Sequence, residues 1–416
     1  MADQTTTIIK GWKMTPLGEM GVAITGKTPS KDNPSDWGDF LDFITPTDIV
    51  SDSKYLNNVA RKLSEDGANR FKKMIIPPKS VVVTCIGSDM GKVVMNRNEA
   101  LTNQQINSIK INSKNDKDYI FYLLKNSYTI LRNIAVGGST MPILNKTTFE
   151  SLEFLTAPLT EQRAIAAVLS SLDDKIELLR EQNKTLEATA QAIFKEWFVN
   201  FNYPEATGKM IDSELGKIPE GWKVGKLIED KISKFVKTNI DQFGGTKDYV
   251  ETANVNLSNF IGNFEKITYE KRPSRANMQP IVNSIWFARM AESRKYLLFQ
   301  EIDDHDIETK ILSTGFAGIE FVKEYLFFYW CFILSDIFND LKKQYAEGAV
   351  QVAISNGGIQ RIMLPLPPKK IADKFKETVG LCFEKISNNT FQIQTLSTLR
   401  DLLLPKLMKG ELRVKI

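Results

Sequence analysis

The chain offers few of the side chains on which catalytic and metal sites depend. Its single histidine, His305, stands in the acidic stretch EIDDHDIE, and its three cysteines, Cys85, Cys331 and Cys382, form no C-x-x-C pair. A structural zinc ion takes about four nitrogen or sulfur ligands. A serine–histidine–aspartate device could use only His305, which better suits an exposed loop. We therefore expect no metal site and no catalytic residue in this chain.

Nucleotide-binding motifs are also missing from the sequence. The segment GSDMGK, residues 87–92, has three residues between its glycines, where a Walker loop has four. The sequence contains neither a dinucleotide fingerprint nor an NPPY-type methyltransferase motif. We therefore expect the chain to bind no cofactor of its own.

The overall composition is that of an ordinary globular protein, with 42% hydrophobic and 25% charged residues. The opening residues MADQTTTIIK lack the apolar core of a signal peptide. The longest apolar run, residues 325–334, is too short to span a bilayer. Isolated cysteines suit a reducing compartment, so we expect a cytoplasmic protein without a membrane partner. The net charge of +4 is small, so an anionic partner would have to bind a local patch.

The elements that position the rest of the chain are two long helices. Within residues 165–197, apolar side chains recur in alternating steps of four and three, with Asn183 as the one polar position and no glycine or proline. This heptad spacing keeps one stripe of a helix facing a partner helix, and at 1.5 Å per residue the stripe is roughly 50 Å long. Thr160 is placed to cap this helix, with Glu161 in its first turn.

The same stripe recurs 210 residues later, from Phe375 to Leu407, with Asn389 and Arg400 as its polar positions. Pro405 removes a backbone donor and should kink or end this second helix near Leu404. In an antiparallel pair, facing residues share a constant sum of residue numbers. A sum of 572 puts Asn183 opposite Asn389 and Trp197 opposite Phe375. Pairing the two amides avoids a buried unsatisfied group, which costs roughly 1–3 kcal/mol, and fixes the register.

A module of mixed strands and helices precedes each long helix. Each module opens on Gly-Trp-Lys, continues through a β-hairpin and an aromatic-rich segment, and closes at a proline before the long helix. The aromatic-rich segment suits a buried helix, and its periodicity alone is also compatible with a strand. The paired segments are 11–13 and 221–223, 80–95 and 284–299, 118–126 and 323–334, and 157–158 and 367–368. The predicted fold is α+β, with two pseudo-symmetric α/β modules separated by an antiparallel two-helix coiled coil. The predicted bounds are 1–158 for the first module, 159–203 for the first helix, 204–220 for a linker, 221–368 for the second module and 369–416 for the second helix.

Several strings together resemble the specificity subunit of type I restriction-modification systems. The matching text is APLTEQRAIAAVLSSLDDKIELLREQNKTLEATAQAIFKEWFVNF, GKIPEGWKVGKL, LPLPPKKIADKF and LRDLLLPKLMKGEL, with TGKTPS, CIGSDMGKV, ALTNQQI and ILSTGF inside the modules. The resemblance covers essentially the whole chain. It departs from the family pattern where QVAIS, residues 351–355, replaces a Gln-Pro start.

The resemblance implies a non-catalytic subunit whose two target-recognition domains each bind one half of a split double-stranded DNA target, spaced by the coiled coil. Methyltransferase subunits would dock on the helices and a restriction and motor subunit would join them. S-adenosylmethionine, ATP and magnesium would bind those partner subunits. The resemblance leaves two other readings open, a coiled-coil scaffold without DNA specificity and a fused restriction enzyme with its own catalysis.

Under this resemblance the candidate DNA-contacting residues lie on hairpin tips and loops. Asparagine and glutamine can make two hydrogen bonds to adenine in the major groove, and arginine suits guanine and phosphate. The candidates in the first module are Lys27, Thr28, Ser88, Lys92, Asn103, Gln104, Gln105, Ser139 and Thr140, and those in the second are Arg289, Arg294, Lys295 and Gln351. Turn decoration explains the amides equally well, and a surface ion pair with Glu292 is the alternative for the arginines. Phe40, Trp37 and Tyr55 could stack on bases, although ordinary packing explains them better.

Overall fold

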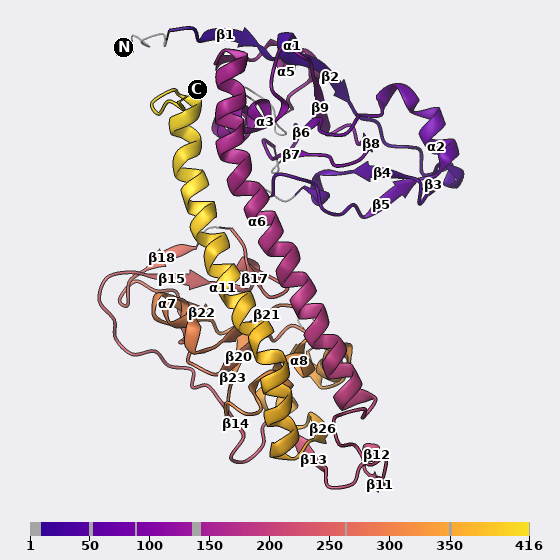
Figure 1. Cartoon of the computed structure of the whole chain (residues 1–416), viewed down its shortest axis with the longest axis vertical. Coiled ribbons are helices and arrows are strands. Elements are labelled where there is room, and N and C mark those ends of the chain that lie inside the picture. The colour runs from indigo at the N-terminus through magenta and orange to yellow at the C-terminus, as the bar shows by residue number, and fades with distance from the viewer. Residues whose placement is uncertain are drawn as a thin grey trace. The chain divides into compact units, whose positions relative to one another are not determined.

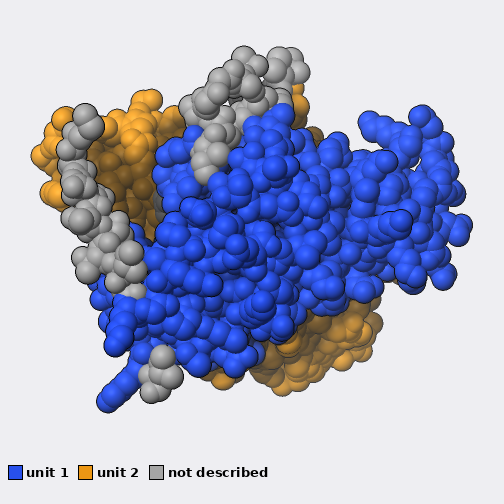
Figure 2. Space-filling view, turned by 90° about the horizontal axis from the view of Figure 1, so that it is seen from above, with its two compact units in different colours: residues 1–178, 392–416 blue, residues 179–391 orange. Residues whose placement is uncertain are grey.

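A computed structural model describes residues 10–49, 53–87, 90–134, 143–262, 264–348 and 352–415. Its contacts divide the chain into two compact units. Unit 1 combines Met1–Leu178 with Gln392–Ile416, and unit 2 is Leu179–Phe391 (Figure 2). Each unit therefore contains one module and one portion of each long helix.

The module of unit 1 is built on two four-stranded sheets. The first has the order β2-β9-β6-β7 and the second has the order β3-β5-β4-β8. Their strands are β2 Gly21–Thr25, β9 Ile106–Ile111, β6 Val81–Thr84, β7 Val93–Met95, β3 Trp37–Gly38, β5 Arg61–Leu63, β4 Leu41–Ile44 and β8 Ala100–Thr102. Helix α3 (Lys117–Asn126), whose residues 119–124 are all buried, belongs to the core of the first sheet together with strands β6 and β9. A short antiparallel pair, β1 (Lys13–Pro16) with β10 (Glu153–Thr156), closes the module.

The module of unit 2 repeats the strand order of the first sheet. Its second sheet shares three successive strands with that of unit 1 and carries its fourth strand on the opposite edge. Its first sheet has the order β14-β23-β20-β21 and its second has the order β18-β15-β22-β19. The strands are β14 Ser233–Phe235, β23 Phe316–Phe321, β20 Ser284–Ala288, β21 Tyr296–Phe299, β18 Glu265–Ile267, β15 Lys247–Val250, β22 Lys310–Ser313 and β19 Ala276–Met278. Helix α8 (Leu326–Leu334) takes the place of α3, and β13 (Lys223–Lys226) with β26 (Met363–Leu366) closes the module.

The repeat extends to the pairing of individual residues. Strands β4 and β8 run parallel, as do β15 and β22, while the other pairs in these sheets are antiparallel. Asp42 faces Lys62 across β4 and β5 in unit 1, and Asp248 faces Lys266 across β15 and β18 in unit 2, each as an ion pair. The repeated hairpins at 80–95 and 284–299 and the buried helices α3 and α8 confirm the elements expected from the sequence.

The two opening glycines have the same conformational reason to be glycine. Gly11 has φ +90° and Gly221 has φ +86°, values that side chains with a Cβ atom rarely adopt. Each glycine precedes a buried tryptophan, Trp12 or Trp222, and then the strand that closes its module. The Gly-Trp-Lys repeat in the sequence therefore marks a turn that both modules need.

The long helices are α6 (Leu159–Phe194), continued by a π-helical turn at Lys195–Val199, and α11 (Lys369–Met408) (Figure 1). Both begin directly after a proline, so the predicted cap at Thr160 is wrong: Thr160 lies inside the first turn, and Pro158 accepts the first helical hydrogen bond through its carbonyl group. Of the kink or end predicted near Leu404, the end is also wrong, because α11 continues through Pro405 to Met408. Pro405 disrupts only one interior hydrogen bond so close to the C-terminus, and buried Leu404, Leu407 and Met408 hold the last turn in the unit 1 core.

In unit 1 the helix segments are antiparallel and joined by buried charges. Arg400 Nη1 lies 2.8 Å from Asp173 Oδ1, and Tyr122 of α3 donates to the other carboxylate oxygen at 2.6 Å. Glu161, in the first turn of α6 as predicted, accepts from Arg413 and from Trp12 Nε1. Asp173 and Glu161 of α6 thus each contact both the module and the C-terminal segment of unit 1.

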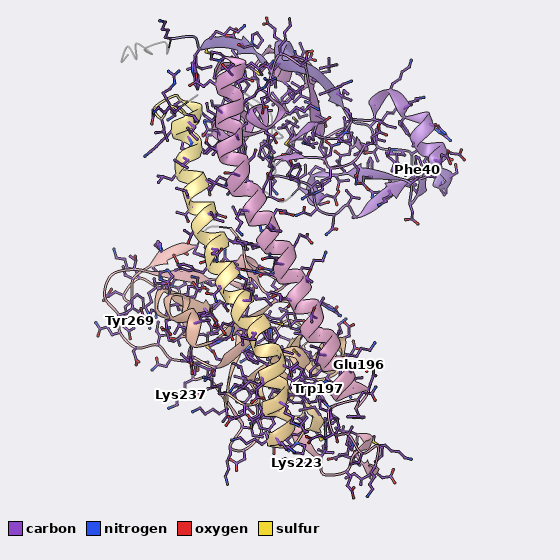
Figure 3. The ribbon with its side chains drawn as sticks, viewed as in Figure 1. Phe40, Glu196, Trp197, Lys223, Lys237 and Tyr269 are labelled. Atoms are coloured by element: carbon purple, nitrogen blue, oxygen red, sulfur yellow. The ribbon has the colours of Figure 1, made fainter. Side chains whose placement is uncertain are left out.

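In unit 2 the predicted antiparallel register is confirmed at its polar position. Asn389 Nδ2 donates to Asn183 Oδ1 at 2.8 Å, and Asn183 Nδ2 lies 3.4 Å from Thr390 Oγ1. About four turns away, the rings of Trp197 and Phe375 are 5.7 Å apart, again with residue numbers summing to 572. Figure 3 labels Trp197 and Glu196 at the end of α6, beside α11.

The segment after α6 contains a small hairpin, β11 (Met210–Ser213) with β12 (Gly216–Pro219), inside the predicted linker of residues 204–220. Glu205 precedes it and contacts Lys370 and Lys374 of α11. Those two lysines hold the pKa of the Glu205 carboxyl down at about 2. In the described part of the chain no helix is long and apolar enough to cross a membrane.

Candidate nucleic-acid interface

Five of the first-module candidates lie together at one end of the parallel strand pair β4 and β8. The connection from β8 to β9 carries Asn103, Gln104 and Gln105, and the backbone N–H of Lys27 donates to the Thr102 carbonyl at 2.8 Å. Thr28 Oγ1 donates to Gln104 Oε1 at 2.6 Å. The structure therefore brings Lys27, Thr28 and the amide triplet together, although they are far apart in the sequence.

The three amide side chains differ in their exposure and in the hydrogen bonds they already make within the module. Asn103 is only 8% exposed, and it uses its side chain to accept from the Gln105 backbone N–H at 3.0 Å and to donate to Gln105 Oε1. Gln104 is exposed and Gln105 is half-buried. Asn103 therefore shapes the turn, and Gln104 and Gln105 face outward. Lys92 lies on the neighbouring hairpin, where its backbone pairs with Thr84.

A shallow hollow opens beside this triplet. Its lining is Thr45, Pro46, Thr47, Arg61, Ile86, Gly87, Asn103 and Gln105. Thr45 and Asp48 form a reciprocal capping box around the short turn Pro46–Asp48 at the end of β4. Sequence reasoning missed Thr45, Thr47 and Arg61. The Thr-x-x-Asp spacing was the available signal for the turn, while nothing local in the sequence places Arg61 beside it.

Of the three aromatic residues considered for stacking, two are packed within unit 1. The ring of Trp37 lies edge-on to Phe43 with 5.1 Å between centroids, and Tyr55 packs against the main core beneath the guanidinium of Arg97. Phe40, by contrast, is 63% exposed. It lies at the outer end of the β3-β5-β4-β8 sheet, on the side away from α6 (Figure 3).

Three of the second-module candidates lie at the β20–β21 hairpin tip, and each of them contacts other residues of the module. Arg289 donates to the Ile354 carbonyl at 3.2 Å and to Asn356 Oδ1 at 2.8 Å, and burial lowers its pKa. Lys295 donates to the Thr252 carbonyl. Arg294 pairs with Asp336 at 2.7 Å rather than with Glu292, the partner considered from sequence. Arg294 is the most exposed of the three.

Helix α9 (Asp336–Gln344) braces this tip. Besides Asp336, it contributes Lys343, which pairs with Glu292 at 2.8 Å, and Lys342, which donates to the Ser293 carbonyl. Lys342 is fully buried, and burial lowers its pKa to about 8. The tip is therefore a rigid platform from which Arg294 projects. Ser88, Ser139, Thr140 and Gln351 lie outside the described residues.

The described residues contain no group of three or more His, Cys, Asp or Glu side chains that could hold a metal ion. His305 is exposed on the short helix α7 (Asp304–Thr309). The three cysteines are free thiols, and burial raises the pKa of Cys85 to about 11. That thiol is therefore a poor nucleophile at neutral pH.

Comparison with known proteins assigns this arrangement to a class. The family model of the type I restriction modification DNA specificity domain matches residues 9–188. Over 98% of its length the chain is 29% identical to the specificity subunit of the type I restriction enzyme MjaIX from Methanocaldococcus jannaschii, of which it covers 95%. A shorter stretch, 35% of this chain and 32% of the relative, is 38% identical to the HindI specificity subunit of Haemophilus influenzae. Along nearly its whole length the chain is therefore similar to a specificity subunit of a type I restriction enzyme.

The fold agrees with this family. The crystal structure of the S subunit from M. genitalium matches 98% of both chains with a TM-score of 0.52 at 15% sequence identity. At that identity the match supports the fold, and the residues that contact a ligand have to be argued from this chain's own structure.

Proposed function

We propose that this chain is the sequence-reading, non-catalytic subunit of a type I restriction-modification enzyme, and that each module binds one half of a split double-stranded DNA target. The observation that carries the proposal is the repeat of the module, in which both copies have the same first sheet and a second sheet that contains a parallel strand pair. Different side chains on equivalent loops suit two half-sites of different sequence. The family match supports DNA as the ligand.

The proposal extends to partners and place of action. Methyltransferase subunits dock on this chain, a restriction and motor subunit joins them, and S-adenosylmethionine, ATP and magnesium bind those partners. The complex acts in the cytoplasm, where chromosomal and incoming DNA are both accessible. A fused restriction enzyme and a protein-only scaffold are the competing functions.

The deciding experiment uses the full chain, alone and with its methyltransferase subunits, against a library of duplex DNA with a randomised block. We expect selection of one split sequence and an affinity that falls steeply with salt, because phosphate contacts release counterions. Binding without sequence preference would favour a scaffold. Methyl transfer from labelled S-adenosylmethionine by the isolated chain would favour a fused enzyme.

A further inference from the structure

The guanidinium N–H groups of Arg61 are available to bind a ligand. Arg61 begins strand β5 opposite Phe43 of β4, is exposed, and lines the hollow beside the amide triplet. No hydrogen bond or ion pair joins its guanidinium to another residue within the described ranges. Arg70, on α2 (Glu65–Arg70) of the same module, shows the ordinary alternative because it pairs with Asp36 at 3.1 Å.

Two aromatic rings hold the Arg61 guanidinium in place. Its central carbon lies 4.6 Å from the centroid of Trp37 and 5.2 Å from that of Phe43. Stacking uses the flat face of the guanidinium and leaves its N–H edge free. The group is therefore oriented before any ligand arrives, which reduces the side-chain entropy lost on binding.

The surroundings of that free edge are polar. Thr45, Thr47, Asn103 and Gln105 line the same hollow, so hydroxyl and amide groups flank the guanidinium. A ligand that satisfies the edge needs two adjacent acceptors, and the major-groove edge of guanine offers O6 and N7 in that spacing. A phosphate also offers two acceptors, but the flanking amides and hydroxyls suit the mixed donors and acceptors of neighbouring base edges.

We propose that Arg61 is a specificity-determining residue that reads a guanine in the half-site bound by the first module. This inference rests on the proposed function and names one base-reading group within it. The second module does not repeat the group: the residue facing Tyr249, the counterpart of Phe43, is Glu265. The half-site of the second module is therefore read differently at the equivalent position.

The test compares DNA selected from a randomised duplex library by the full chain with its methyltransferase subunits, for wild type, Arg61→Ala and Arg61→Lys. In Arg61→Ala we expect the preference for guanine at one position of one half-site to fall about 5- to 150-fold, with the other half-site unchanged. In Arg61→Lys the charge stays but the planar fork is lost, so preference at the same position should fall while overall affinity changes little. Arg70→Ala removes an equal charge from the same module and should leave the selected sequence unchanged.

Three results would overturn the inference. The first is a wild-type consensus that Arg61→Ala and Arg61→Lys both leave intact, or one with no G·C pair in either half-site. The second is a uniform loss of affinity in Arg61→Ala with a shallower salt dependence, which indicates a phosphate contact. The third is a wild type that selects no sequence at all, which would overturn the proposed function as well, whereas the first two leave that function standing.

Discussion

At the scale of single residues, we expect Arg294 to contribute to DNA binding but very little to the stability of the fold. Its ion pair with Asp336 leaves half of the arginine side chain and 78% of the aspartate side chain exposed, and such pairs contribute about 0–1 kcal/mol. Arg294→Ala should therefore leave the free energy of unfolding within about 1 kcal/mol of wild type. It should weaken DNA binding mainly through the second half-site, because one cation leaves the hairpin tip.

Thermal melting and titration with half-site variants of the DNA measure the two effects. The matched control is Lys369→Ala, which breaks the exposed pair with Glu324 at 2.7 Å in the same unit and should change neither property. If Arg294→Ala leaves both affinity and sequence preference unchanged, the hairpin tip does not contact DNA.

Asp303 makes the stability of unit 2 depend on pH. Burial raises the pKa of its carboxyl to about 6, above the value near 3.9 of an unfolded chain. The folded state thus holds the proton more tightly, so stability from this group is highest below pH 4 and is lost as pH rises through 6. Asp303→Asn should raise stability at pH 7.5 by about 1–2 kcal/mol and flatten this dependence, because asparagine can still accept from the Gln300 N–H. Urea unfolding at pH 4, 5, 6 and 7.5 tests this, and an unchanged pH profile in the variant would contradict it.

The sequence predicts some site residues and misses others for a physical reason. Asn103, Gln104 and Gln105 are adjacent in the chain, so their common turn could be inferred from local signals. Arg61 reaches the same hollow only because β5 pairs with β4 and β4 pairs in parallel with β8. Register between distant strands is set by side chains that meet only in the fold, so this placement could not be read from local spacing.

At the scale of elements, the paired amides of Asn183 and Asn389 fix the helix register in unit 2. Asn183→Leu would leave the buried Asn389 amide without its 2.8 Å partner and should cost about 1–3 kcal/mol. Replacing both asparagines by leucine should recover most of this stability, since two apolar side chains leave no unpaired amide. A double-mutant cycle by urea unfolding measures the coupling, and additive effects of the two substitutions would show that the pair does not act as a unit.

The long helices were the most predictable elements, because the heptad pattern extends over many turns. Their ends were less predictable. From the local sequence, Pro405 predicts the end of the helix. Helix α11 nevertheless continues to Met408, because Leu404, Leu407 and Met408 are buried in the unit 1 core. Packing in this case outweighs one lost backbone hydrogen bond.

At the scale of the whole molecule, unit 1 is assembled from both ends of the chain. A chain ending at Phe391 would lose the buried side chains of Leu404, Leu407 and Met408 and leave Asp173 without Arg400. Each buried apolar side chain contributes about 1.5–3 kcal/mol, and total stability is about 5–15 kcal/mol. The truncation should therefore unfold unit 1 while unit 2 keeps its structure.

Hydrogen exchange read by peptide is the appropriate measurement. Residues 117–126 of unit 1 should lose protection, and residues 326–334 of unit 2 should keep it. A chain ending at Gly410 retains all three apolar side chains and is the control. Equal protection of residues 117–126 in the chain ending at Phe391 and in the full chain would show that the C-terminal helix is dispensable to unit 1.

The division into two similar modules could be predicted from the 210-residue repeat alone. The sheet order could not, because each parallel pair joins strands that are separated by long stretches of sequence, and alternation within a strand carries no information about its neighbour.

Unit 1 combines residues 1–178 with residues 392–416. The first module can therefore be completed only after the second of these segments has been synthesised. Residues 392–416 are synthesised after all of unit 2, and at ordinary translation rates of about 5–20 residues per second the first 178 residues wait on the order of ten seconds or more for them. A ribosome that stalls, or a message broken before codon 392, should therefore release no fragment with a finished first module. The cell would then contain no incomplete subunit that could direct methylation to the many sites that carry only half of the target.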